Sequence, residues 1–289
     1  MAVVNTNIGA SIAQAALMRN ERALSTAMEQ LSTGKKINSA GDNAAGLAIS
    51  TRMTTQIQGL GAAIRNASDA ISMINTAEGA VDEITNMLQR MRELAVQAGT
   101  GTTDSADRGY LHQEYVALRG EIDRIAENTQ WNGRNILDGN AGVTATYGAS
   151  KVTFQIGANP SQGFSTGFGD FTDGSGIMSF IAASTQLNTG TIASAIQESS
   201  RAIVALDTAI SEVSSQRAKF GAATNRLTHT IDNLTNIKTN SESSRSRILD
   251  TDYAAATSEL ARTQIIQQAG TAMLAQANQL PQTVLALLQ

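Results

Sequence analysis

Large apolar residues recur along this chain at alternating steps of three and four, a spacing that places them on one side of an α-helix. The pattern is strongest between Ala44 and Ala98, where it predicts one unbroken helix. At ~1.5 Å per residue such a helix is about 80 Å long, far beyond the length usual in globular domains. A shorter helix is predicted from about Ser105 to the Asn132-Gly133 turn, and a second long one from about 192 to 245. Helices of this length favour an elongated bundle.

The two ends of the chain carry a similar pattern on a background of small and amide residues. Residues 263–289 contain no Asp, Glu, Lys or Arg, but amide side chains and Pro281 interrupt them, so they are not predicted to span a membrane. We expect this end to be disordered in an isolated chain and helical in an assembly, because its apolar residues are too few to stabilise it alone. The predicted seam residues are Leu17, Leu24 and Leu31 at one end, and Ile266, Met273, Leu280, Val284 and Leu287 at the other.

The centre of the chain differs in composition from both helical parts. Five of the 6 Phe residues lie between Asp138 and Gly190, among many Gly and Thr residues. Residues 145–147 and 152–156 flank Gly148-Ala149-Ser150 and predict a β-hairpin, whereas 161–175 gives no clear fold. The predicted fold class is therefore mainly α: a long antiparallel bundle or coiled coil of N- and C-terminal segments, with a small central insert that contains a β-hairpin.

Composition and charge exclude several classes of function. The net charge is −4 and no basic run is present, which gives no reason to expect nucleic acid or an anionic membrane as a partner. Cysteine is absent, and the 2 histidines, His112 and His229, form no zinc motif. We therefore predict no enzyme activity, no metal and no cofactor. The first twelve residues lack a basic region followed by a compact apolar one, so no cleavable secretory signal is expected.

Several long motifs stand out along the helical parts of the chain. They are LSTGKKINSAGDNAAGLAIS (31–50), LQRMRELAVQ (88–97), EIDRI (121–125), TQWNG (129–133), SRSRILDTDY (244–253) and QQAGTAMLAQANQLPQ (267–282). In this order they resemble the terminal blocks of bacterial flagellins, and the resemblance covers roughly residues 1–159 and 191–289.

The resemblance implies a structural subunit that polymerises into the extracellular flagellar filament for motility. It implies three regions: terminal coiled-coil segments (1–43 and 246–289) in an inner layer, a long-helix bundle with a β-hairpin (44–160 and 191–245) in an outer tube, and a short variable surface insert (161–190). The implied partners are other copies of the chain, the flagellar export apparatus and an export chaperone, the filament cap and the hook–filament junction proteins. The alternative is a junction protein of related architecture. We expect removal of 263–289 to abolish polymerisation and removal of 161–175 to leave it largely intact.

The motif at 88–97 carries a further implication of the same resemblance. Flagellins with this motif are recognised as monomers by the Toll-like receptor of vertebrate innate immunity. The positions that match the recognised pattern are Gln89, Arg90, Leu94 and Gln97, with Glu114 on the adjoining helix. From spacing alone the same residues indicate an ordinary charged helix face, with Leu94 near its edge.

Overall fold

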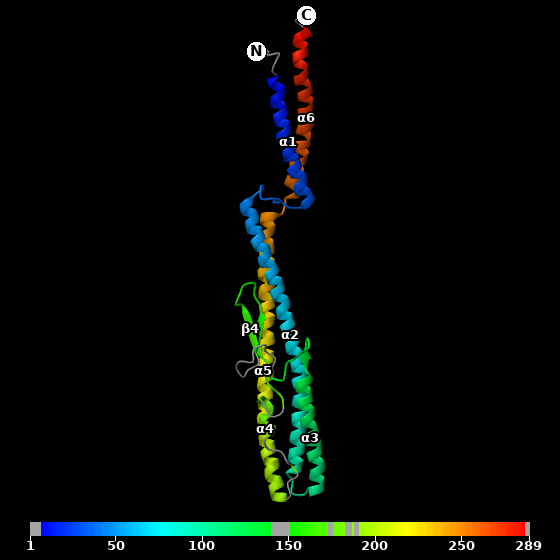
Figure 1. Cartoon of the computed structure of the whole chain (residues 1–289), viewed down its shortest axis with the longest axis vertical. Helices are drawn as coiled ribbons and strands as arrows, with labels where there is room; N and C mark the ends of the chain where they lie inside the picture. Colours follow the sequence, from blue (N-terminus) through cyan, green and yellow to red (C-terminus); the bar gives the residue numbers. More distant parts are fainter. Residues whose placement is uncertain (1–6, 140–150, 173–175, 183–186, 188–190, 287–289) are drawn as a thin grey trace. The chain divides into compact units, whose positions relative to one another are not determined.

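A computed structural model describes residues 7–139, 151–172, 176–182, 187 and 191–286 (Figure 1). The chain divides into two compact units. The first unit contains both ends, Met1–Ile57 and Thr239–Gln289, and the second contains Gln58–Lys238. The helices are α1 (Ile8–Thr33), α2 (Ala44–Ala98), α3 (Ser105–Asn128), α4 (Ser179–Ala182), α5 (Ile192–Leu249) and α6 (Tyr253–Ala286), with a 3-10 turn, η1 (Gly176–Met178).

The long helices confirm the fold class and most of the predicted boundaries. The predicted helix from Ala44 to Ala98 has the same bounds in the structure, and α5 runs four residues beyond the predicted end at Arg245. The chain leaves α5 where the carbonyl oxygen of Leu249 accepts a hydrogen bond from the amide of Lys36, at 2.7 Å. The amide of Thr251 in turn donates to the carbonyl oxygen of Gly34 at 3.0 Å, so two backbone bonds join the loop after α1 to the loop before α6.

In the first unit, α1 and α6 form an antiparallel helix pair. Gly34 ends α1 with a left-handed conformation (φ 69°), which glycine adopts at little cost, and its amide donates to the carbonyl oxygen of Gln30. In the loop that follows, the carboxylate of Asp42 accepts hydrogen bonds from the amides of Ser39 and Asn38, and these bonds lower its pKa. Helix α6 is already formed in the single chain, so the expected disorder of residues 263–286 is wrong. The expectation treated this end of the chain as a lone helix, whereas α6 packs against α1 within the same chain.

The second unit has a main apolar core that α2, α3, α5 and the central segment share, and a smaller cluster of Leu60, Ala63 and Leu234. Ile84, Leu88 and Met91 of α2 are fully buried in the main core, as are Tyr115 of α3 and Leu206 of α5. The predicted seams of these three helices are therefore confirmed as packing faces.

Ionic and polar contacts hold the ends and flanks of the helices in the second unit. Arg108 is almost fully buried, and its guanidinium donates to the carbonyl oxygens of Ala98, the last residue of α2, and of Thr100 in the loop that follows. On the flank, Arg92 pairs with Asp207 of α5 at 2.6 Å and lowers the pKa of that carboxyl. This pairing stabilises the fold above the ordinary carboxyl pKa and is lost as the pH falls through the lowered one, and its effect is small because both side chains are half exposed.

Two short hairpins follow α3. Strands β1 (Gln130–Trp131) and β2 (Arg134–Asn135) enclose the predicted Asn132-Gly133 turn, in which both residues have positive φ, at 50° and 75°. Strand β3 (Lys151–Gln155) agrees with the strand predicted at 152–156. The partner predicted for it, 145–147, lies outside the described residues. In the structure β3 pairs with β4 (Gly163–Gly167), which falls in the stretch that gave no clear fold.

The central segment contributes to the core as well as to the surface. Phe168 and Phe171 are fully buried, and the Phe168 ring lies 5.6 Å from that of Phe220 on α5. The side-chain amide of Gln216 on α5 also donates to the carbonyl oxygen of Gly167 at 2.6 Å. The surface position expected for 161–190 therefore does not apply to its large apolar side chains.

Candidate assembly and recognition surfaces

Two asparagine side chains form hydrogen bonds across the interface between α1 and α6. Nδ2 of Asn20 donates to the carbonyl oxygen of Thr263 at 2.8 Å, and Nδ2 of Asn7 donates to that of Ala277 at the same distance. The side-chain oxygen of Asn7 also accepts from the amide of Ala10, so this one residue caps α1 and fixes it to α6. Neither asparagine was predicted as a seam residue, because both are polar positions within an apolar pattern.

Glycine allows the closest approach between the two helices. A methyl group added at Gly270 would lie 2.7 Å from Cδ2 of Leu17, too close for a real contact. Leu17 is half-buried, as are Leu24 and Leu31, so these three predicted residues lie on the face of α1 that packs against α6.

The face of α6 that meets α1 differs from the predicted stripe. It contains Ala256, Leu260, Thr263, Gln267, Gly270, Leu274 and Ala277, all of them buried or half-buried. Ile266 and Met273 lie beside this face and are 41% and 66% exposed. Leu280 and Val284 belong to α6, but their side chains lie outside the described residues, as does Leu287. This face therefore mixes small and amide residues with Leu260 and Leu274, whereas the prediction followed a neighbouring stripe of large apolar residues.

Ile266 and Met273, which lie beside the interface rather than in it, border a groove on the α1–α6 pair. The groove has a volume of about 330 Å³, and Ile12, Leu17, Ile266 and Met273 line it together with small residues of α1 and Gly270. Ile12 is 66% exposed. Further large apolar residues are exposed along the same two helices: Ile8, Met18, Met28 and Ile265. An apolar surface of this extent is typical of a protein–protein contact.

A second candidate surface lies on the second unit, where α2 and α3 run past each other. The guanidinium of Arg90 is 2.9 Å from Oε1 of Glu114 on α3 and 3.0 Å from Oε2 of Glu93 on α2. The hydrogen bond from Arg90 to Glu114 is the main reason that the pKa of Arg90 is raised, and the bond to Glu93 adds to it. Gln89 and Gln97 are exposed on the same helix. The structure thus brings Arg90 and Glu114 together and leaves the two glutamines accessible.

Leu94 is the exception among the residues matched to the receptor pattern. It is 1% exposed and belongs to the core, whereas the spacing placed it near the edge of the charged face. Helix α2 shares this core with both α3 and α5, so its buried arc is wider than a two-helix seam and includes Leu94 as well as Met91 and Ala95. A side chain in this position supports the surface from beneath.

Among the described residues, no group of three or more His, Asp or Glu side chains is placed to hold a metal ion. In the part of the chain that the structure describes, no helix is both long enough and apolar enough to cross a membrane.

Comparisons with known protein families identify the family to which this chain belongs. The family model of the bacterial flagellin N-terminal helical region matches residues 4–142, and that of the C-terminal helical region matches residues 203–288. The chain belongs to the bacterial flagellins. It is therefore a structural subunit of the flagellar filament, which lies outside the cell, and a member of a structural protein family.

Individual relatives match this flagellin over its whole length. It is 45% identical to a flagellin of Bacillus subtilis (strain 168) over 302 positions, which cover 99% of each chain. It is 36% identical to Flagellin A of Vibrio cholerae over 383 positions, again 99% of each. The second alignment is longer than the 289 residues of this flagellin, so that relative carries additional residues.

A solved structure shares the fold at low identity. The structure of a putative flagellar hook-associated protein from Vibrio parahaemolyticus has a TM-score of 0.60 and 13% identity, and covers 72% of this flagellin and 100% of that chain. At this identity the likeness shows the fold alone.

Proposed function

We propose that this flagellin polymerises through α1 and α6 into the inner layer of a helical filament that drives motility. The observation that carries the proposal is the exposed apolar surface on the helix pair, above all Ile12, Ile266 and Met273 around the groove. Covering each of these side chains with a neighbouring subunit would contribute roughly 1 to 3 kcal/mol. The same contact repeated from subunit to subunit, without closing into a ring, generates a helical polymer.

The remaining parts of the proposal concern position and partners. We place the terminal segments 1–43 and 246–289 in the inner layer, and the long-helix bundle, 44–160 and 191–245, in the outer tube. The exported chain would meet the flagellar export apparatus and an export chaperone, then the filament cap, and at the filament base the hook–filament junction proteins. Family membership supports these partners, and the absence of charge from 263–289 suits a position in the inner layer.

Self-assembly of the purified protein tests the function directly. Full-length flagellin seeded with short fragments of its own filaments is expected to elongate them into long filaments, visible by negative-stain electron microscopy. The alternative, a hook–filament junction protein, would add to the seeds without extending them. Seeds that keep their length over a range of protein concentrations and salt conditions would rule out the filament subunit in favour of that alternative.

We also propose that the flagellin monomer is recognised by the vertebrate Toll-like receptor through the surface around Arg90. Gln89, Arg90, Gln97 and Glu114 are accessible side chains of this surface, and Leu94 packs beneath them. Glu114 and Glu93 hold the Arg90 guanidinium in one position, so less side-chain entropy is lost when a partner binds. Because the same surface is expected to pack between subunits, monomers should signal and intact filaments should not.

Cells that express the receptor test this recognition. Arg90→Ala is expected to lower signalling by about tenfold or more, the usual size for a central arginine of an interface. Arg65→Ala removes an equally exposed charge elsewhere on α2 and is the matched control. Leu94→Ala is unsuitable as a contact probe because it opens a cavity in the core and lowers stability. Equal signalling by wild type, Arg90→Ala and Arg65→Ala would contradict the assignment.

A further inference from the structure

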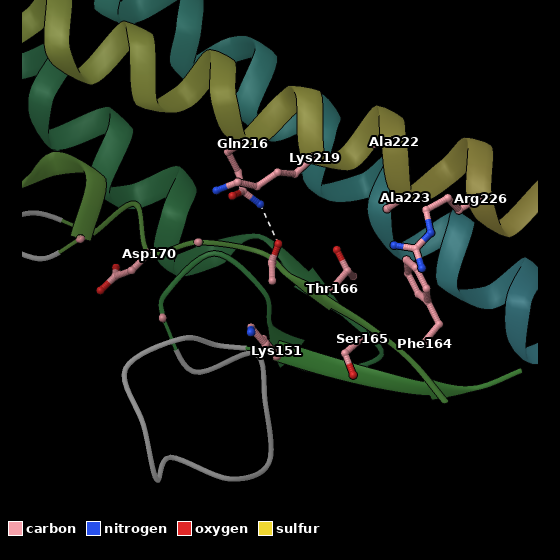
Figure 2. A pocket seen from close by; sticks show the side chains of 14 residues that line it. Lys151, Phe164, Ser165, Thr166, Asp170, Gln216, Lys219, Ala222, Ala223 and Arg226 are labelled. Carbon is pink, nitrogen blue, oxygen red and sulfur yellow. Dashed lines mark hydrogen bonds between the residues drawn. The ribbon is translucent and has the colours of Figure 1, made fainter. Parts of the chain in front are cut away.

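A hollow of about 670 Å³ lies in the second unit, between the β3–β4 hairpin and α5 (Figure 2). Figure 2 shows Gln216, Lys219 and Arg226 on α5 along one side, with Lys151, Ser165 and Thr166 on the strands opposite. Its volume is in the range of pockets that hold a ligand of several rings. It is distinct from the α1–α6 groove and from the surface around Arg90.

The charge of this pocket is opposite to that of the whole chain. Lys151, Lys219 and Arg226 line it, and none of the three forms an ion pair with a carboxylate of the described residues. The one acidic lining residue, Asp170, already accepts hydrogen bonds from the amide and hydroxyl of Thr172. Three cations against one carboxylate, in a chain of net charge −4, make the pocket a local site for anions.

The spacing of residues on α5 shapes the pocket. Lys219 and Arg226 are seven residues apart and so lie on one side of the helix, about 10 Å from each other along its axis. Ala222 and Ala223 occupy the turn between them and leave the space that larger side chains would fill. The arrangement suits an extended ligand with more than one negative group along its length.

The two sides of the pocket are also well supported. The guanidinium of Arg226 lies 4.9 Å from the centroid of the Phe164 ring, which is itself buried, so a cation–π contact orients the arginine. The bond from Gln216 to Gly167 holds β4 against α5. The hydroxyl group of Thr166 and the backbone at Gly167 and Gly169 provide neutral hydrogen-bonding groups between the charges, whereas the Ser165 hydroxyl pairs with that of Thr153 on the outer face of the hairpin.

We propose that this pocket binds an acidic oligosaccharide, a sugar chain that carries sulfate or carboxylate groups. The separated cations would bind two acidic groups, and the hydroxyl and backbone groups between them would bind sugar hydroxyls. Flagellins lie outside the cell, where acidic sugar chains are available and nucleotides are scarce. The proposal is independent of the polymerisation contact because it concerns only residues of the second unit.

Calorimetric titration of purified full-length flagellin tests the proposal. The probe is a sulfated tetrasaccharide of defined length, compared with maltotetraose and with inorganic sulfate at the same concentration of sulfate groups. We expect saturable one-to-one binding of the sulfated sugar, and no binding of maltotetraose. Lys219→Ala/Arg226→Ala is expected to weaken binding at least tenfold, since it removes two charge-assisted contacts. Ala222→Glu, which places a carboxylate on the lining, is expected to abolish it.

The control variant separates the pocket from general charge attraction. Arg65→Ala/Arg247→Ala removes two exposed charges outside the pocket and should change affinity less than twofold. Circular dichroism of each variant confirms that the helices are intact. Equal weakening by both double variants, unchanged binding by Ala222→Glu, or complete displacement of the sugar by inorganic sulfate at that matched concentration would each overturn the proposal.

Discussion

Flagellin carrying Ile266→Asp and Met273→Asp is expected to keep the helix content of the wild type and to form no filaments. Both side chains lie beside the α1–α6 interface and reach solvent, Met273 at 66% and Ile266 at 41% exposed, so a charge on each can stay hydrated in the single chain. In the proposed polymer the same positions are covered by a neighbour, and a carboxylate buried without a partner costs several kcal/mol. Because each subunit repeats the defect, elongation should fail altogether. Seeded assembly measured by light scattering and electron microscopy provides the test.

A matched variant separates the groove from the lack of charge along α6. Gln264→Asp/Gln268→Asp adds the same two charges to exposed positions on the other side of the helix, away from the groove. It is expected to polymerise, more slowly than the wild type. Filaments formed at the wild-type rate by the Ile266→Asp/Met273→Asp protein would show that the groove is not the contact, whatever the control variant does.

In the first unit, the position of this groove could not be predicted from the sequence. Heptad spacing selected Leu17, Leu24 and Leu31 on α1, and all three are half-buried. On α6 it selected Ile266 and Met273, because periodicity is judged from the largest apolar residues. The face that packs against α1 instead contains Thr263, Gln267 and Gly270 beside Leu260 and Leu274, and at Gly270 the lack of a side chain leaves room for Leu17. Nothing local in the sequence indicated which of the two neighbouring stripes the partner would use.

In the second unit, too, the helices could be predicted from the sequence, but not all of the contacts between them. The bounds of α2 were predicted correctly because 3.6-residue periodicity and the flanking glycines are local signals. The burial of Leu94 was not, because a helix that packs on two partners buries a wider arc than one seam. The pairing of β3 with β4 was also missed, since β4 is only five residues long and has a Gly at each end, which weakens its strand propensity on its own. Its assignment depends on contacts with β3 and α5.

Phe168→Ala is expected to destabilise the second unit by about 3 to 5 kcal/mol, the usual cost of removing a fully buried phenylalanine. Phe168 has no exposed surface and packs against Phe220 of α5, so the truncation opens a cavity between the central segment and the bundle. Urea unfolding followed by fluorescence measures this, because the protein has 1 Trp residue, Trp131, which packs against the same core. The signal therefore reports on the second unit even if the first unfolds separately.

Phe154→Ala is the matched control, since Phe154 is only half-buried and pairs with Phe164 across the hairpin. Its cost should be clearly smaller than that of Phe168→Ala.

The same reasoning changes what we expect from removal of residues 161–175, which the sequence alone predicted to leave polymerisation largely intact. Deleting them takes Phe164, Phe168 and Phe171 out of the core, so the deleted protein should lose the cooperative Trp131 transition. If that deletion left the transition midpoint unchanged, the central segment would be a dispensable surface element, and the anion pocket that it forms with α5 would have no structural basis.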